Sequence, residues 1–218
     1  MDATARIEQT LEEILTRAES PGSPPRLAAA LRYAVFPGGA RVRPRLCLAV
    51  AHACGDDQPA LADAAAASIE LLHCSSLVHD DLPCFDDAAL RRGKPSVHLA
   101  FGEPLAVLAG DALIVMAFEC LATAAAATPL RLPGVLSKIA GSVGMPYGIV
   151  AGQAWECEPE VDLAKYHREK TGSLFAAATE AGALAAGQSP AAWRRLGECI
   201  GEAYQVADDL HDLLGKAA

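Results

Sequence analysis

Apolar residues recur along the chain at spacings of three and four, the period of an amphipathic helix, rather than in the alternation typical of strands. Alanine and leucine dominate these stretches, whereas proline and glycine fall between them. No linker or shift in composition divides the chain, so we expect one all-α domain over residues 1–218. The pattern predicts helices at 5–19, 25–35, 43–53, 59–82, 104–127, 131–144, 162–187 and 190–214.

Composition excludes several classes of protein. The 218 residues carry a net charge of −9, whereas a nucleic-acid-binding protein would normally present a basic face. Seven cysteines form no CxxC pair, which favours reduced thiols in the cytoplasm over disulfides or a zinc site. The first twenty residues carry charges throughout, and the longest uncharged stretch, 139–155, is interrupted by glycines and a proline. We therefore expect no secretory signal, no membrane span and no nucleic-acid partner.

The segment 79–98 combines carboxylates with an arginine pair. It contains Asp80, Asp81, Asp86, Arg91 and Arg92. A proline at position 83 should end the helix after the first two aspartates, so we expect a local bulge that brings Asp86 back towards Asp80. Arginine binds phosphate with two parallel hydrogen bonds, which makes the adjacent pair a candidate phosphate site.

A second acidic cluster lies near the end of the chain, in the segment 204–215. Its Asp208 and Asp212 are four residues apart, so in a helix both carboxylates project from one face, with Asp209 beside them. Like charges at this spacing repel, and Mg²⁺ would offset the repulsion. A solvated acidic helix end is the alternative for either cluster alone. Two clusters, the first with an arginine pair, favour a metal-bridged diphosphate.

Two further segments carry basic side chains. Arg41, Arg43 and Arg45 follow a Gly-Gly turn, where they could bind an anion or simply be solvated. Lys170 and Thr171 interrupt an apolar, alanine-rich stretch, and a lysine there could equally extend its ammonium to solvent.

Together, and in this order, the motifs GGxRxRP, DDxxxxD followed by RRG, KT and YQxxDDxxD resemble those of the trans-isoprenyl diphosphate synthases, or polyprenyl synthetases. The resemblance runs from about residue 27 to the C-terminus. The segments PGGARVRP, LVHDDLPCFD, EPLAVLAGD and AGQAWE are most similar to those of bacterial geranylgeranyl diphosphate synthases of carotenoid and bacteriochlorophyll pathways.

The resemblance implies an isoprenoid synthase-type helical bundle around a deep central cavity. It implies a cytoplasmic homodimer that condenses isopentenyl diphosphate with an allylic diphosphate, here farnesyl diphosphate, to give geranylgeranyl diphosphate and diphosphate. The expected cofactor is Mg²⁺, as three ions bound with diphosphate.

The resemblance also implies roles for individual residues. The implied metal ligands are Asp80, Asp81, Asp86, Asp208, Asp209 and Asp212. The implied substrate-binding residues are Arg43, His73, Arg91, Arg92, Lys170, Thr171 and Gln205. The implied catalytic residues are Asp80, Asp81, Asp86, Lys170 and Asp208.

Product length can be argued from helix geometry. Ser76 and Ser75 precede Asp80 by four and five residues, so both lie below the metal site on the cavity side. Two serines leave the pocket open, which favours a twenty-carbon product over fifteen. The floor is then expected deeper, at Leu72, Met116 and Phe118.

Two features depart from the family pattern. Ala40 stands where many members carry a lysine that contacts isopentenyl diphosphate, although the geranylgeranyl subgroup shares this alanine. The chain ends just after the second aspartate motif, so the C-terminal helices of typical relatives are expected to be missing. The alternatives are a synthase of farnesyl or longer-chain diphosphates and a non-catalytic regulatory subunit of such a synthase.

Overall fold

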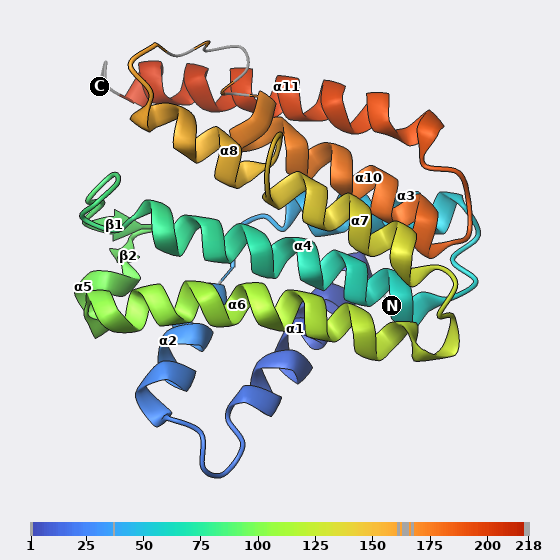
Figure 1. The fold of residues 1–218 in the computed structure, drawn as a ribbon, viewed down its shortest axis with the longest axis horizontal. Coiled ribbons are helices and arrows are strands. Elements are labelled where there is room, and N and C mark those ends of the chain that lie inside the picture. Colours follow the sequence, from blue (N-terminus) through green and yellow to red (C-terminus); the bar gives the residue numbers. More distant parts are fainter. Residues whose placement is uncertain (1, 37, 161, 163–165, 167, 216–218) are drawn as a thin grey trace.

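The computed structural model describes residues 2–36, 38–160, 162, 166 and 168–215, with side chains except at 168, 208, 209 and 211–215. The described chain folds almost entirely into helices (Figure 1). The longer helices are α1 (Ala3–Ala18), α2 (Pro25–Val35), α3 (Val42–Ala53), α4 (Pro59–Asp80), α6 (Glu103–Ala124), α7 (Leu132–Val143), α10 (Ser173–Ala185) and α11 (Ala191–Gly215). The shorter elements are β1 (Leu90–Arg91), β2 (Lys94–Pro95), α5 (Val97–Phe101), η1 (Ala125–Ala127), α8 (Ile149–Ala154), η2 (Trp155–Cys157) and η3 (Arg168–Gly172). The expected all-α fold class is confirmed.

Helix α4 forms the centre of the bundle. It packs against α1, α2, α3, α6, α7 and α10. Its residues 64–72 are buried without interruption, which is typical of a helix that is covered on all sides. Small alanine side chains at 64–67 let the neighbouring helices approach closely. The site described below lies at the C-terminal end of this central helix.

Helix α6 lies directly against that end of α4. The hydroxyl of Ser75 donates a hydrogen bond of 2.9 Å to the carbonyl oxygen of Gly110. A Cβ atom at Gly110 would lie only 2.0 Å from Nε2 of His79, so any larger residue would push the histidine away. The glycine thus permits the close contact that fixes the end of α4.

Arg41 ties three helices together from inside the core. It is 3% exposed and has a left-handed backbone conformation, with φ of 50°. Its guanidinium donates to Glu70 of α4 at 2.6 Å, to Glu8 of α1 at 2.8 Å and to the carbonyl oxygen of Val35 in α2 at 3.0 Å. Arg41 is therefore structural, and its suggested role in anion binding is wrong.

The elements differ from the sequence prediction in four places. Helix α4 ends at Asp80 rather than at 82, as expected where proline follows closely. The segment 83–102 holds a small hairpin and α5, and the segment 144–157 holds α8 and η2, none of which was predicted. In the stretch predicted as one helix at 162–187, η3 is a single π-helical turn before α10, and 163–165 and 167 lie outside the described residues.

The hairpin gives the arginine pair its geometry. Strands β1 and β2 are antiparallel and pair Arg91 with Lys94. The two loop residues, Arg92 and Gly93, have φ of 53° and 76°. Positive φ at both loop positions is what a type I′ turn requires, and its twist matches that of the flanking strands. The turn separates the two arginines, so that Arg91 lies on the strand and Arg92 at the tip.

Two helical segments are long and apolar enough to cross a membrane by length and composition alone. They are α4 and Glu103–Ala127, whose most apolar windows are 78% and 39% buried within the fold. A core helix passes the same test, and α4 is the core helix of this bundle. The segment Glu103–Ala127 instead leaves one apolar face exposed, which includes Val107, Leu108 and Val115.

The buried arginine gives a prediction about stability. Replacing Arg41 with methionine leaves Glu70, which is 2% exposed, without its guanidinium partner. Removing one member of a buried ion pair costs about 3–5 kcal/mol, and we expect the free energy of unfolding in urea to fall by that amount. The control is Arg32→Met, because its ion pairs with Glu12 and Glu19 lie at the surface and are worth less than about 1 kcal/mol. Equal losses in the two variants would contradict this reading.

Candidate active site

A cavity of about 820 Å³ opens beside the C-terminal end of α4. Apolar side chains from several helices line its interior, among them Leu72, Ile114, Val143, Ile149 and Leu174. Most of the residues that the sequence assigned to the site also line it, namely Arg43, His73, Ser75, Ser76, Asp80, Arg91, Arg92, Lys170, Thr171 and Gln205. Charged and polar side chains thus share the cavity with apolar walls, as an amphipathic substrate would require.

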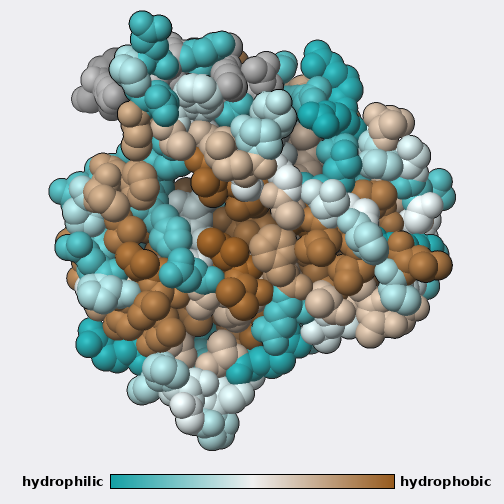
Figure 2. All heavy atoms as spheres, viewed as in Figure 1, coloured by the Kyte–Doolittle hydropathy of each residue, from teal (hydrophilic) through white to brown (hydrophobic). Residues whose placement is uncertain are grey.

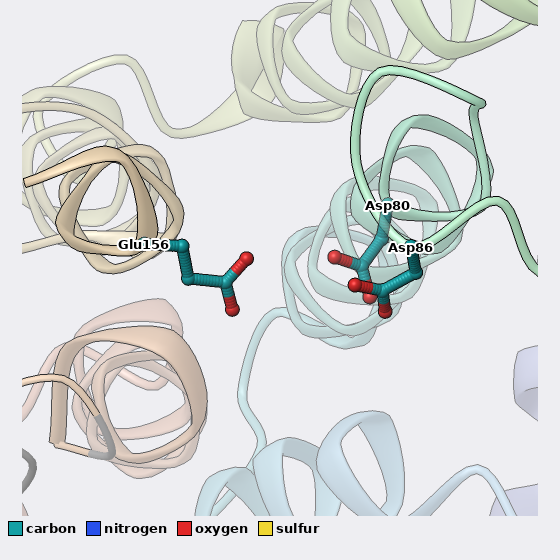
Figure 3. A group of neighbouring side chains, drawn as sticks. All are labelled: Asp80, Asp86 and Glu156. Carbon is teal, nitrogen blue, oxygen red and sulfur yellow. The ribbon is translucent and has the colours of Figure 1, made fainter.

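The first acidic motif bends back on itself at the mouth of the cavity. The amide of Asp86 donates to the carbonyl oxygen of Asp80 at 3.0 Å, which confirms the expected bulge. The two carboxylates consequently point in the same direction, and Glu156 faces them from the opposite side (Figure 3). Ligand oxygens of all three lie within 4.8 Å of one another. Burial and the charge of Asp80 raise the pKa of Asp86.

This arrangement suits a hard divalent cation. The donors of the first motif, Asp80 and Asp86, are carboxylate oxygens, which Mg²⁺ prefers over nitrogen and sulfur. The Oδ1 atom of Asp80 is buried yet accepts no hydrogen bond, so it retains its capacity to bind a cation. Its closest basic group is the ammonium of Lys170, at 3.3 Å. The residues present therefore fit a magnesium site at this mouth.

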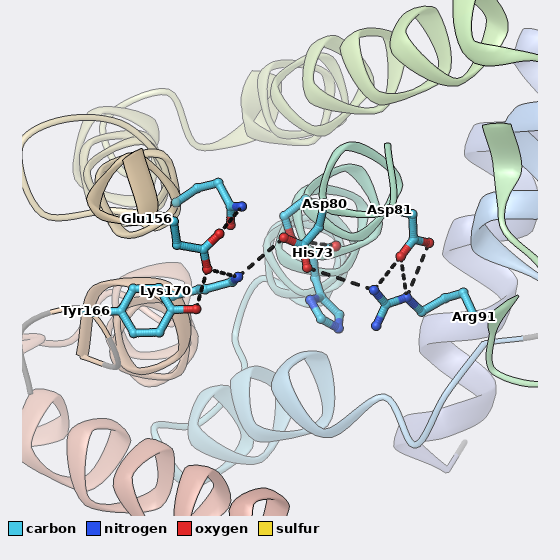
Figure 4. A network of polar contacts seen from close by, with 9 residues as sticks. His73, Asp80, Asp81, Arg91, Glu156, Tyr166 and Lys170 are labelled. Atoms are coloured by element: carbon cyan, nitrogen blue, oxygen red, sulfur yellow. Dashed lines mark hydrogen bonds and ion pairs between the residues drawn. The ribbon is translucent and has the colours of Figure 1, made fainter. Parts of the chain in front are cut away.

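Asp81 faces away from the other carboxylates and binds Arg91. Its carboxylate is buried and accepts hydrogen bonds from Nε of Arg91 at 2.9 Å and from Nη2. The hydrogen bond to Asp81 raises the pKa of Arg91. Arg91 also lies 3.9 Å from Asp80, which holds its guanidinium at the rim (Figure 4). A metal-binding role for Asp81 stays a prediction.

A basic wall faces the acidic motif. Arg43 lies 3.4 Å from Nε2 of His73, and its guanidinium stacks 4.4 Å from the ring centre of Phe175. Arg92 packs over the Gly-Gly turn, since a Cβ at Gly39 would lie 3.1 Å from its guanidinium. Burial, and then the charges of Arg43 and Arg92, hold the pKa of His73 well below its usual value. A neutral imidazole beside arginines can donate or accept a hydrogen bond without adding charge.

The second acidic motif lies on α11, whose residues Tyr204 and Gln205 reach the cavity. The side chains of Asp208, Asp209 and Asp212 lie outside the described part of the structure. Their role as metal ligands stays a prediction.

Ser75 and Ser76 both line the cavity, as the helical spacing from Asp80 predicts. The hydroxyl of Ser75 donates a hydrogen bond to the carbonyl oxygen of Gly110, and the hydroxyl of Ser76 donates one of 2.8 Å to the carbonyl oxygen of His73. Of the side chains expected at the floor, Leu72 lines the cavity. Met116 and Phe118 pack against the core and are not among the residues that line this cavity, so their place at its floor stays a prediction.

Glu156 is the acidic residue that sequence reasoning missed. It belongs to the AGQAWE segment, to which no role had been assigned, and it lies on the short helix η2. Burial opposes its charge, but hydrogen bonds from Lys170 and Tyr166 outweigh burial and lower its pKa. No spacing rule connects it to the first motif, because only the tertiary fold brings the two together.

The environment of His73 gives a prediction about pH. The unfolded chain binds a proton at this residue near pH 6.5, whereas the folded chain does not, so its contribution lowers stability as the pH falls below that value. In NMR spectra we expect the ring signal that disappears in His73→Gln to stay constant from pH 8 down to about 5.5. A midpoint at or above pH 6.5 would contradict this.

Comparison with known proteins places these features in a family. The chain matches the polyprenyl synthetase family model over residues 24–218. It is 59% identical over 212 residues to a geranylgeranyl diphosphate synthase of Cereibacter sphaeroides, covering 97% of this chain and 74% of that protein. It is 56% identical over 217 residues to one of Rhodobacter capsulatus, covering 100% and 75% respectively.

Solved structures agree. A geranyltransferase from Legionella pneumophila matches with a TM-score of 0.87 and 36% identity, over 98% of this chain and 78% of the other. A structure described as an FPP/GFPP synthase from Zymomonas mobilis matches with a TM-score of 0.84 and 36% identity, over 97% and 81%. With its aspartate motif, basic wall and apolar cavity, the chain belongs to the polyprenyl synthetase family.

Proposed function

We propose that this protein is a magnesium-dependent prenyltransferase that condenses isopentenyl diphosphate with farnesyl diphosphate to give geranylgeranyl diphosphate and diphosphate. The observation that carries the proposal is the meeting of Asp80, Asp86, Arg91 and Lys170 at the mouth of an apolar cavity. Both bacterial relatives described above bear the name geranylgeranyl diphosphate synthase, which supports the same product.

The chemistry begins with loss of diphosphate from the allylic substrate. The carbon–oxygen bond breaks, the diphosphate keeps the electron pair, and an allylic cation remains. Arg91 and Lys170 lie at the mouth, where they stabilise the charge that develops on the leaving group. Mg²⁺, held by Asp80 and Asp86 together with Asp81, Asp208, Asp209 and Asp212, would supply further neutralisation of that charge.

Carbon–carbon bond formation follows inside the cavity. Arg43, His73 and Arg92 hold isopentenyl diphosphate, whose double bond attacks the allylic cation. Loss of a proton to the departing diphosphate then restores an alkene. Thr171 and Gln205 line the allylic side, and the apolar walls exclude water that would otherwise capture the cation.

The central assay uses isopentenyl and farnesyl diphosphates with Mg²⁺, with products read by mass spectrometry. We expect a twenty-carbon product that disappears with EDTA. Asp80→Asn should lower kcat/KM by about 10²–10³-fold, the cost of losing one electrostatic stabiliser of a transition state. The matched control is Asp87→Asn, because the Asp87 side chain is 72% exposed.

Two outcomes would contradict the proposal. One is a purified chain without turnover, and the other is turnover that survives EDTA. Equal activity of Asp80→Asn and Asp87→Asn would remove the proposed role of the first acidic motif.

Chain length gives a separate prediction. Ser76 lines the cavity one helical turn below Asp80, so a phenylalanine there would close it beneath a shorter chain. With geranyl diphosphate as primer, we expect Ser76→Phe to shift the product from twenty carbons to fifteen. Ser76→Ala removes the hydroxyl without adding bulk and should leave product length unchanged. A twenty-carbon product from Ser76→Phe would place the length determinant elsewhere.

We also propose that three Mg²⁺ ions bind together with the diphosphate. We further propose that the protein is a cytoplasmic homodimer. Support for the dimer comes from α6, where Val107, Leu108 and Val115 are exposed on one face. Apolar side chains gather across the face of the molecule shown in Figure 2. Seven free cysteines fit a reducing compartment. Analytical ultracentrifugation should give twice the chain mass of 22.6 kDa, and Val115→Lys should give the monomer.

A further inference from the structure

The AGQAWE segment has no part in the chemistry above, although it lies against the turn that carries Lys170. A Cβ atom at Gly152 would lie 2.5 Å from the backbone nitrogen of Lys170 and 2.7 Å from its Cα. Helix α8 therefore approaches this backbone more closely than any residue with a side chain would allow. The glycine makes the position of η3 depend on α8.

A second contact joins η3 to η2, the turn that follows α8. The indole nitrogen of Trp155 donates to Oε2 of Glu169 at 2.7 Å. Glu169 is 3% exposed and immediately precedes Lys170. A buried carboxylate is costly without a partner, so this hydrogen bond fixes the π-helical turn against η2. The turn that carries Lys170 is thus held in two ways: its backbone packs against Gly152, and the side chain of Glu169 is hydrogen-bonded to Trp155.

The third contact acts on the ammonium itself. Lys170 donates to Oε1 of Glu156 at 2.7 Å, and the hydroxyl of Tyr166 donates to the same oxygen (Figure 4). Gln153 donates to Oε2 of Glu156 at 2.8 Å. Both carboxylate oxygens are therefore engaged, whereas Oδ1 of Asp80 accepts no hydrogen bond. This difference favours a structural use of Glu156 and leaves the metal to Asp80.

The distances show which carboxylate holds the lysine. Charge-assisted hydrogen bonds between nitrogen and oxygen are about 2.7–2.9 Å long, which matches the contact with Glu156. The ammonium lies 3.3 Å from Asp80, so it is attracted there without being bonded as closely. A lysine on its flexible stem would otherwise move onto Asp80 and neutralise the oxygen that the metal needs.

We propose that Glu156 is a positioning residue that holds the Lys170 ammonium beside the acidic motif, ready for the allylic diphosphate, and keeps it from closing onto Asp80. This inference rests on the function proposed above. It also explains the AGQAWE segment: Gly152 and Trp155 position the turn η3, and Glu156 positions the ammonium of Lys170.

The kinetic test compares Glu156→Gln with Glu158→Gln, an exposed carboxylate two residues further on. We expect Glu156→Gln to lower kcat about 10- to 100-fold, the cost of one hydrogen bond to a charged group. The KM for isopentenyl diphosphate should change less than about twofold, because Arg43 and His73 are untouched. Glu156→Asp, which keeps the charge, should recover part of the loss, and Glu158→Gln should match the wild type.

A binding measurement separates this inference from the proposed function. With Mg²⁺ present, the affinity for inorganic diphosphate should fall about tenfold in Glu156→Gln and stay unchanged in Glu158→Gln. The affinity for Mn²⁺ alone should be the same in both variants and weaker in Asp80→Asn. Circular dichroism should show the same helix content throughout.

The outcomes decide between the possibilities. Wild-type kcat and diphosphate affinity in Glu156→Gln would overturn the positioning role. Loss of Mn²⁺ binding in Glu156→Gln would make Glu156 a metal ligand and also overturn it. A wild-type chain without turnover would refute the proposed function, and the diphosphate measurement would still test the placement of Lys170.

Discussion

The site depends on the balance of charge around the ammonium of Lys170. Asp80, Asp86 and Glu156 bring three carboxylates to the mouth of the cavity, and their mutual repulsion needs a cation. Burial opposes the charge of Lys170, but hydrogen bonds to Glu156 and Tyr166 and the attraction of Asp80 outweigh it and raise its pKa above the usual value. The lysine therefore stays charged. Its single positive charge neutralises the three carboxylates only in part, so the remaining negative charge can still attract a divalent cation, which in turn can bind a diphosphate.

The rest of the fold serves to hold these charges in place. Helix α4 is buried on all sides over residues 64–72, which fixes the position of Asp80 at its end. The type I′ hairpin presents Arg91 to the buried carboxylate of Asp81, and α8 sets the turn that carries Lys170. Each charged group thus comes from a different element, and each is anchored by a contact made inside the bundle. Preorganisation of this kind is what electrostatic catalysis requires.

Local chemistry explains what the sequence could predict. The proline after Asp81 was enough to foresee the return of Asp86, and helical periodicity was enough to place Ser75 and Ser76 on the cavity wall. The same periodicity predicted the main helices, since each buries a continuous apolar face. The short elements between them, such as the hairpin and α8, have too few residues to show a period.

Tertiary contacts explain what it could not predict. Arg41 and Arg43 are two residues apart in one motif, yet one is locked in the core with Glu70 and the other lines the cavity. Their surroundings differ because α3 begins between them, and the left-handed backbone conformation of Arg41 turns the chain just before the helix. Glu156 meets Asp80 only because the tertiary fold brings η2 and η3 to the end of the central helix, where Lys170 lies between the two carboxylates. No pattern within either segment carries that information.

The most direct test of the account is a calorimetric titration of the protein with inorganic diphosphate, with and without Mg²⁺. If the acidic mouth binds diphosphate through a divalent cation, affinity should rise at least about tenfold when Mg²⁺ is added, because the carboxylates repel the free anion. Equal affinity with and without the metal would contradict the account, since Lys170 and the arginines alone would then form the diphosphate site.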